Sequence, residues 1–394
     1  MQPGPSIILA LASKQIWPHV LTVTAYKPQR LILLHSDDER ESRLPAQRLK
    51  KFFEKQNLVS PGAVSLREIP DDDFHGVERE IAAAVRELSI PPSECALNFT
   101  GGNKLMAAAA FHFAIERGLN AIYLERRNSV TWFMPGDKSM ATRTDTLDAH
   151  QADGIDPVAL LRCQIDASEV EREGEMITLN ERGAALALED FRTQAESGTD
   201  MLPFLSVRGE ADRDAREGDP LEYAAAAVVL KLGVSQVRRS LRLKVRSTAG
   251  VSTRVPHAEI DLLFNFGGHL WIVDCKDRKP AADLLKPLDT LLKPHLKNSE
   301  LQKHLARLRD QLSISETKAL KEDLLAIREA GGLLGKVVCV RKSEPPDEVK
   351  QFARHNQIEI IPKRNMFFGW QSLLFPDRPP DAESLAGLLT AFHS

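Results

Sequence analysis

Residues 258–279, AEIDLLFNFGGHLWIVDCKDRK, contain two apolar segments separated by a pair of glycines. This pattern predicts two β-strands joined by a tight turn at Gly267 and Gly268, because such turns favour glycine. Asp261 lies in the first strand and Asp274 near the end of the second. A carboxylate in an apolar strand costs free energy unless a partner or ligand compensates for it. We therefore expect the two aspartates to be functional.

The second strand ends in Asp274, Cys275 and Lys276. Side chains alternate along a strand, so Asp274 and Lys276 share one face, and Cys275 fits the core on the other face better than it fits a nucleophile. Asp261, Asp274 and the backbone carbonyl of Cys275 can share one divalent cation, and these hard oxygen ligands favour Mg²⁺ or Mn²⁺. Lys276 can then orient a water or stabilise developing charge. The pattern indicates metal-assisted cleavage of a phosphodiester, although an Asp-x-Lys sequence also occurs by chance.

The composition is that of a globular protein of two domains and a connector, with 394 residues and 43% hydrophobic residues. A net charge of −3 argues against a protein that coats nucleic acid by bulk charge. No apolar run is long enough to span a bilayer, so we expect a cytoplasmic protein without a membrane partner. The cysteines form no C-x-x-C pair, which argues against a zinc site or a disulfide framework: Cys95, Cys163, Cys275 and Cys339.

The first part of the chain alternates apolar strands with amphipathic helices, which is typical of a parallel sheet covered on both faces. We predict strands at 6–11, 30–35 and 95–99 and helices at 42–57, 74–88 and 104–117. A hairpin of 121–124 and 130–134 follows, and the first domain is expected to span 1–138. The polar range 139–200 is interpreted as a connector containing a helix at 181–195.

The range 201–394 is expected to form a second α/β domain. Its predicted elements are a helix at 221–232, a basic strand at 240–246, the two strands of the opening hairpin, and two late strands at 336–341 and 358–361 that enclose a helix at 347–355.

The segment 98–104, NFTGGNK, lies between a predicted strand and a predicted helix. Glycines there let the backbone approach a ligand, and the helix N-terminus favours an anion such as a phosphate. The spacing is not that of a Walker nucleotide site. The alternative is that Gly101 and Gly102 only form a tight turn. The polar loop 12–15 favours a ligand site, because it also follows a strand of the same sheet.

Residues 1–138 resemble a CARF domain, the Rossmann-like sensor of cyclic oligoadenylates in type III CRISPR systems. The resemblance is carried by the loop with Gln15 and Pro18, by Ser36 after the second strand, and above all by NFTGGNK. It implies that two protomers form a homodimer and hold one ring-shaped ligand, cyclic tetra-adenylate. The residues implied as its contacts are Ser13, Gln15, Ser36, Thr100, Gly101, Gly102, Asn103 and Lys104. Many relatives carry threonine in place of Asn103.

The second domain resembles the PD-(D/E)XK restriction-endonuclease-like core through Asp261, Asp274 and Lys276. Many relatives carry glutamate where Asp274 stands, which changes the reach of the carboxylate. Glu222, in the Ala-rich helix that precedes these strands, is a further candidate catalytic residue. Its alternative role is that of a first-turn glutamate favoured by the helix dipole. Glu259 shares a strand face with Asp261 and is a candidate auxiliary ligand or a solvated side chain.

The range 228–256 is basic and contains no acidic residue. We call its arginines and lysines the basic stripe: Arg238, Arg239, Arg242, Lys244 and Arg246, with Lys231 and Arg254 beside them. We expect the basic stripe to contact a nucleic-acid backbone. The alternative is an edge strand protected by positive charge.

Together the two halves resemble CRISPR ancillary effectors that join a CARF sensor to a nuclease. The resemblance implies an endonuclease activated by cyclic tetra-adenylate that cuts DNA, single-stranded RNA or both. The alternative is a ligand-responsive nucleic-acid-binding regulator with an inactive nuclease-like fold. An Arg-x4-His pattern at Arg30 and His35 lies in a core strand, so we do not assign a helical RNase site to it.

Overall fold

The computed structural model describes residues 4–88, 91–125, 128–136, 140–165, 170–209, 219–243, 259–276 and 335–376, together with scattered positions between 303 and 325. The chain divides into two compact units. Unit 1 contains residues 1–167 and 265–269, and unit 2 contains residues 168–264 and 270–394.

Unit 1 is built on a seven-stranded sheet in the order β3-β2-β1-β4-β5-β6-β7. The first five of these strands are parallel, whereas β6 and β7 are antiparallel additions at one edge. The strands are β1 (Ile7–Leu11), β2 (Arg30–His35), β3 (Val64–Glu68), β4 (Cys95–Asn98), β5 (Asn120–Leu124), β6 (Ser129–Pro135) and β7 (Met140–Thr146).

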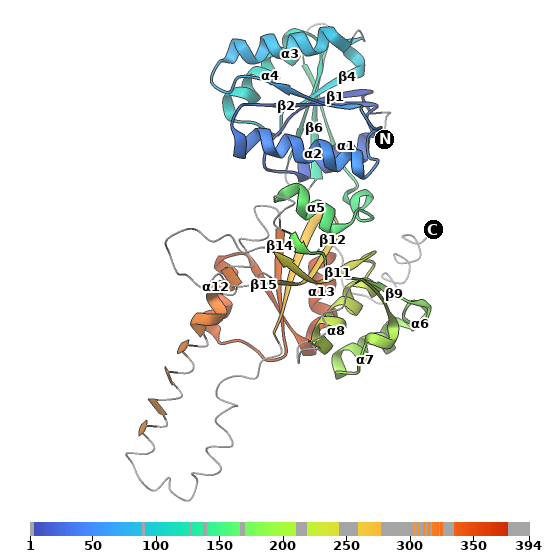
Figure 1. Cartoon of the computed structure of the whole chain (residues 1–394), viewed down its shortest axis with the longest axis vertical. Helices are drawn as coiled ribbons and strands as arrows, with labels where there is room; N and C mark the ends of the chain where they lie inside the picture. Colours follow the sequence, from blue (N-terminus) through green and yellow to red (C-terminus); the bar gives the residue numbers. More distant parts are fainter. Residues whose placement is uncertain are drawn as a thin grey trace, which may run out of the picture. The chain divides into compact units, whose positions relative to one another are not determined.

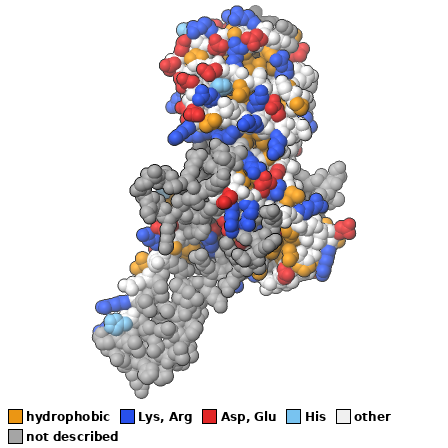
Figure 2. Space-filling model, in the orientation of Figure 1, with side chains coloured by type: hydrophobic (Ala, Val, Ile, Leu, Met, Phe, Trp, Pro, Cys, Tyr) orange, Lys and Arg blue, Asp and Glu red, His pale blue; other side chains and the backbone are white. Residues whose placement is uncertain are grey.

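Helices cover both faces of this sheet, with α1 and α2 on one side and α3 and α4 on the other (Figure 1). They are α1 (Trp17–Tyr26), α2 (Leu44–Lys55), α3 (Phe74–Leu88) and α4 (Lys104–Glu116), and α5 (Pro157–Gln164) packs against α2. The burial of β1 and β2 on both faces explains why these strands are almost wholly apolar. Acidic and basic side chains are interspersed over the visible surface of unit 1 (Figure 2).

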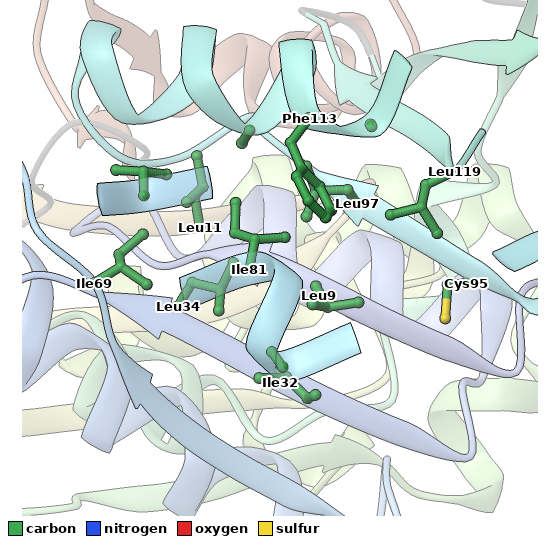
Figure 3. Packing of buried hydrophobic residues seen from close by; sticks show 14 of the residues in the cluster. Leu9, Leu11, Ile32, Leu34, Ile69, Ile81, Cys95, Leu97, Phe113 and Leu119 are labelled. Carbon is green, nitrogen blue, oxygen red and sulfur yellow. The ribbon is translucent and has the colours of Figure 1, made fainter. Parts of the chain in front are cut away.

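A core of apolar side chains fills the space between this sheet and helices α3 and α4 (Figure 3). Leu9, Leu34 and Leu97 project from three neighbouring strands and are fully buried, as is Ile81 from α3. This layer fixes the carboxyl ends of β1, β2 and β4, where the predicted ligand loops begin.

The sheet of unit 1 continues beyond position 138, where the sequence predicts the first domain to end. Strand β7 pairs with β6 through the whole of Met140–Thr146. It was not predicted because its sequence, MATRTDT, is that of a largely exposed edge strand without an apolar face. Strand β3, another edge strand, was missed for the same reason.

Residues 265–269, which form the turn between β12 and β13 and the adjoining ends of both strands, belong to unit 1, and the rest of both strands belongs to unit 2. Gly267 and Gly268 both have positive φ, as a two-residue hairpin turn requires. The Gly267 N–H donates to Asp153 Oδ1 at 2.8 Å, and the Asn265 side-chain amide donates to the Ala152 carbonyl at 2.5 Å.

Unit 2 contains an eight-stranded mixed sheet in the order β10-β9-β11-β12-β13-β14-β15, with β8 also paired to β11. The strands are β8 (Val170–Arg172), β9 (Glu175–Leu179), β10 (Leu205–Arg208), β11 (Val237–Leu243), β12 (Glu259–Phe266), β13 (His269–Lys276), β14 (Gly335–Arg341) and β15 (Ile358–Pro362). Three of them, β8 to β10, precede the predicted helix of this domain, and β8 and β9 lie within the predicted connector range 139–200.

The helices of unit 2 are α6 (Glu181–Ala185), α7 (Leu188–Ser197), α8 (Asp219–Lys231), α12 (Asp347–His355) and α13 (Met366–Leu374). Helices α7, α8 and α13 pack against one another, and α8 also packs on β9 and β11. Buried alanines in α8 allow this close approach to the sheet, which places the first turn of α8 next to β11. Among the described residues, no helix is both long enough and apolar enough to cross a membrane.

Candidate functional site

The β12–β13 hairpin brings Asp261 and Asp274 together. The two aspartates are equally far from the two-glycine turn, so the hairpin places them opposite each other on adjacent strands. The backbone N–H of Cys275 donates to Asp261 Oδ2 at 2.6 Å, which places the Cys275 backbone alongside that carboxylate. The predicted meeting of these three residues is therefore observed within unit 2.

Lys276 and Cys339 bind the Asp274 carboxylate. Lys276 Nζ lies 2.6 Å from Asp274 Oδ1, and the Cys339 thiol, on the parallel strand β14, donates to Asp274 Oδ2 at 3.6 Å. The Asp274 side chain is buried. Lys276 thus places one ammonium group directly beside a buried carboxylate, as the Asp-x-Lys pattern predicts.

Burial raises the pKa of Asp261 well above its usual range. The negative charges of Asp274 and then Glu222 add to this rise in pKa, and Lys276 opposes it. Three carboxylates therefore lie within electrostatic range of one another, with one ammonium among them. A divalent cation would relieve this repulsion, and carboxylate oxygens are ligands that Mg²⁺ and Mn²⁺ accept.

The predicted donor set has two carboxylates and one backbone carbonyl, so a divalent cation there would need further oxygen ligands to complete its coordination. No group of three or more His, Cys, Asp or Glu side chains in the described part of the chain is arranged to hold a metal ion by side chains alone. The predicted set of Asp261, Asp274 and the Cys275 carbonyl contains only two side-chain donors. Burial also raises the pKa of the Cys275 thiol well above its usual range, which agrees with a core role for that side chain.

Glu222 lies in the first turn of α8 and is held there by Arg239. Arg239 Nε donates to Glu222 Oε2 at 2.8 Å, and Arg239 Nη1 donates to Glu175 Oε2 at 2.6 Å. Arg239 Nη1 also lies 3.1 Å from the Tyr223 hydroxyl, and the guanidinium stacks over the Tyr223 ring at 4.4 Å. Glu175 and Tyr223 were not predicted, because neither belongs to a motif and β9 carries no strong strand signal.

The position of Arg239 corrects its predicted place in the basic stripe. Its side chain is only 5% exposed and is paired with two carboxylates, so it does not present a charge to a nucleic-acid backbone. Lys231 is also buried, where its ammonium donates to the Gly183 and Ala184 carbonyls. Arg238 and Arg242 are partly exposed on β11. Three members of the predicted stripe lie outside the described residues: Lys244, Arg246 and Arg254.

In unit 1, Gly101 lies against the end of β1. A Cβ atom at Gly101 would lie 1.9 Å from the Leu11 carbonyl oxygen and 3.3 Å from Ser13 Oγ. Only glycine permits this approach, which brings the NFTGGNK turn and the first loop together, as predicted. Gln15 and Lys104 are exposed in these segments, and Gly102 has a positive φ.

The polar side chains of the turn are largely engaged in holding its shape. Thr100 Oγ1 accepts the Leu124 N–H at 2.8 Å. Asn103 caps α4 by accepting the Met106 N–H at 2.8 Å, and its amide donates to the Asp71 carbonyl at 2.8 Å. Asn103 therefore orders the loop itself, whatever contact it makes with a ligand.

Ser36 is buried at the end of β2. Its N–H donates to Ser42 Oγ at 3.0 Å, and the Ser42 hydroxyl donates to the Ala12 carbonyl at 3.2 Å. Ser36 is thus connected through Ser42 to Ala12, in the loop after β1. It follows the second strand, as the sequence predicts.

No protein family and no curated protein matches this sequence. Solved structures do match. Can2 from Sulfobacillus thermosulfidooxidans, in complex with cyclic tetra-adenylate, superposes with a TM-score of 0.56 at 14% identity, over 94% of this chain and 97% of that one. The chain therefore has the fold of Can2. Protein VC1899 from Vibrio cholerae superposes with a TM-score of 0.57 at 12% identity, over 93% of this chain and 97% of that one.

A type III CRISPR defence DNA nuclease activated by cyclic oligoadenylate is 19% identical, with a TM-score of 0.49 over 88% of this chain and 47% of that one. The fold class predicted from the sequence is confirmed by the two multistranded α/β sheets and by the likeness to Can2 over both units. At such low identity, the likeness shows the fold alone.

Proposed function

We propose that this protein is a metal-dependent endonuclease of type III CRISPR antiviral defence that cyclic tetra-adenylate activates. The observation that carries the proposal is the meeting of Asp261, Asp274 and Lys276 beside Glu222 in unit 2. The likeness to Can2, which was solved with cyclic tetra-adenylate, supports the choice of activator. We assign sensing to unit 1 and cleavage to unit 2, in the cytoplasm.

In this proposal Asp261, Asp274 and the Cys275 carbonyl hold Mg²⁺ or Mn²⁺, with Glu222 beside them. The cation supplies charge neutralisation at the scissile phosphate and lowers the pKa of a bound water. Lys276, held 2.6 Å from Asp274, is placed to orient that water or to stabilise the negative charge that develops on the phosphate. Arg238 and Arg242 contribute contacts to the DNA or single-stranded RNA backbone.

The activator site in unit 1 consists of the NFTGGNK turn and the first loop. The approach of Gly101 to Leu11 and Ser13 leaves no room for a side chain between the two loops. The helix N-terminus at Lys104 favours the phosphates of the ring. Two copies of unit 1 hold one ring across a homodimer axis, and ring binding favours the dimer state in which the nuclease sites are active.

The test is cleavage of plasmid DNA and of single-stranded RNA with Mg²⁺ or Mn²⁺, with and without cyclic tetra-adenylate. We expect cleavage that needs both metal and ring and that falls by at least about 100-fold in Asp274→Asn, because the carboxylate charge is lost while the shape is kept. Glu359→Ala, at an exposed position of the edge strand β15, is the matched control and should cut at the parent rate. Metal-independent cleavage, or an Asp274→Asn variant as active as the parent, would contradict the nuclease assignment. Ring-dependent nucleic-acid binding without cleavage would favour the regulator instead.

A further inference from the structure

Arg341 is a buried cation at the end of β14 for which the structure describes no acceptor. Among the lysine and arginine residues that the structure describes, three are buried: Lys231, Arg239 and Arg341. Lys231 donates to two backbone carbonyls, and Arg239 binds two carboxylates. Arg341 is 3% exposed, its Nε is buried without a hydrogen-bond partner, and no ion pair joins it to another described residue. Arg341 therefore differs from the other two buried cations.

The pairing of β13 with β14 places Arg341 beside the candidate site. Arg341 is the register partner of Lys276, as Cys339 is the partner of Asp274. Register partners on neighbouring strands project to the same face, and the contact of 3.6 Å between Cys339 Sγ and Asp274 Oδ2 shows this for the adjacent pair. Arg341 follows Cys339 by two residues and shares its face. The side chains of Asp274, Lys276 and Arg341 therefore lie on one face of the sheet.

The backbone around Arg341 is held on both sides. The Lys342 N–H donates to the Lys276 carbonyl at 3.2 Å, which continues the β13–β14 pairing one residue past Arg341. On its other side, Arg341 pairs with Pro362 of β15. Neighbouring strands lie about 4.8 Å apart, so the side chains of Lys276 and Arg341 start close together. Two cations that a sheet fixes side by side can bind one anion between them.

Cations flank the two aspartates on this face of the sheet. Strands β11 and β14 are the outer neighbours of the β12–β13 hairpin. On β11, Arg242 pairs with Glu259, which shares a face with Asp261 because the two are separated by one residue. Arg341 holds the corresponding place on β14 through its pairing with Lys276. A nucleic-acid backbone that crosses the hairpin on this face would meet a cation on each side of the carboxylates.

Stability alone is a weak explanation for Arg341. A buried guanidinium without an acceptor costs desolvation free energy that no contact compensates, and an apolar side chain of similar volume often serves a core equally well. A phosphodiester offers two non-bridging oxygens, which the paired N–H donors of a guanidinium can bind together. The position of Arg341 beside Lys276 and Asp274 favours a phosphate of the nucleic acid that those residues are proposed to cut.

From this geometry we propose that Arg341 binds a backbone phosphate of the nucleic-acid strand at the candidate nuclease site, next to Lys276. The inference rests on the proposed nuclease function and adds a substrate-binding residue to it. It also gives β14, a strand to which the sequence assigns no site residue, a part in substrate binding.

The test is binding of labelled DNA and single-stranded RNA oligonucleotides to the full-length protein with cyclic tetra-adenylate and Mn²⁺. An Asp274→Asn background prevents cleavage during the measurement. We expect Arg341→Met to weaken binding of the cleaved class of nucleic acid by about 10- to 100-fold, the effect of losing one hydrogen bond between charged groups. The log–log salt dependence of that affinity should fall by about 1. Arg341→Lys should keep the salt dependence and recover only part of the affinity, because it retains the charge and loses the fork.

Two further measurements separate this role from a structural one. Arg341→Met loses no described acceptor contact, so its unfolding temperature should equal or exceed that of the parent. The matched control is Lys231→Met, which removes a buried cation that donates to the Gly183 and Ala184 carbonyls. It should lower the unfolding temperature and leave nucleic-acid affinity unchanged. Mn²⁺ affinity without nucleic acid, measured with Asp274 intact, should not fall in Arg341→Met, because a cation near the carboxylates is lost.

Equal nucleic-acid affinity and salt dependence with and without Arg341→Met would overturn the inference and leave the nuclease proposal intact. An unfolding temperature of Arg341→Met as low as that of Lys231→Met would also overturn it, because Arg341 would then be a structural cation. If Arg341→Met does not fold, Arg341→Lys provides the comparison, and failure of both to fold would overturn the inference. Loss of binding in Arg341→Met by a protein whose parent cuts nothing would overturn the nuclease proposal and keep the phosphate contact. A parent that binds no nucleic acid would overturn both.

Discussion

Replacement of Gly101 by alanine tests the predicted ligand loop of unit 1. The added Cβ atom would lie 1.9 Å from the Leu11 carbonyl oxygen, and real Cβ atoms do not approach other atoms closer than 3.0 Å. The turn must therefore move away from β1 by at least 1.1 Å, the difference between these two distances. Overpacking of this kind costs about 1–3 kcal/mol in the free energy of unfolding.

A displacement of this size also affects ring binding. It moves the Gly101 turn away from Ser13, and both belong to the predicted contacts of the ring. A shift of 1.1 Å is enough to break a hydrogen bond to a charged phosphate, which is worth about 1.5–3 kcal/mol. We therefore expect Gly101→Ala to weaken the binding of cyclic tetra-adenylate by about 10- to 100-fold.

The assay is calorimetric titration of the full chain with cyclic tetra-adenylate, together with thermal unfolding. The control is Gly154→Ala, also in unit 1, where a Cβ atom would meet nothing within 4 Å. Mn²⁺ binding by unit 2 should be the same in both variants. If Gly101→Ala matches Gly154→Ala in both unfolding temperature and ring affinity, the argument from close backbone approach is wrong.

The remaining predictions concern pH, the ammonium group beside Asp274, and salt. Burial lowers the pKa of His19 from 6.5 to about 4. Between pH 6.5 and about pH 4 the unfolded chain therefore binds more protons than the folded chain. The free energy of unfolding should be about 2 kcal/mol lower at pH 5 than at pH 7. His19→Leu should remove this loss of stability between pH 7 and pH 5. A His19→Leu variant whose melting temperature depends on pH as that of the parent does would contradict the prediction. Lys276→Gln should lower the cleavage rate by about 100-fold or more while Mn²⁺ affinity is kept or raised, because Asp274 loses a competing cation. Replacing Arg238 and Arg242 by glutamine should reduce the salt dependence of DNA affinity by a log–log slope of about 2, and an unchanged slope would place the backbone contacts elsewhere.

Strongly patterned segments were predicted to the residue. The predicted bounds 30–35, 74–88 and 347–355 are those of β2, α3 and α12. Each is either largely apolar or regularly amphipathic, so local sequence is enough to specify it. The strands that were missed lie where the local signal is weak, at sheet edges or within the polar range 139–200. Their pairing depends on strands that are distant in the chain, such as β9 with β11.

The residues of the candidate site also differ in how far local sequence determines their positions. Asp261, Asp274 and Lys276 could be brought together from the sequence, because one short hairpin fixes their relative positions. The role of Arg239 could not, since its partners Glu175 and Glu222 are remote in the chain and an arginine in a basic run fits a phosphate contact and a buried ion pair equally well. Similarly, nothing local indicates that the Gly267-Gly268 turn belongs to unit 1.

The burial of Arg239 also changes the net charge around the β12–β13 hairpin. The ionisable groups around the hairpin and the first turn of α8 include four carboxylates and three cations: Glu175, Glu222, Asp261 and Asp274, with Arg239, Lys276 and the buried Arg341 of β14. When all are ionised, one negative charge remains, so the carboxylates still outnumber the cations. If Arg239 faced solvent, as the basic run suggested, the buried group would be more negative and the carboxylates would repel one another more strongly. The burial of Arg239 therefore removes a phosphate contact from the surface and at the same time lowers the negative charge of the buried group.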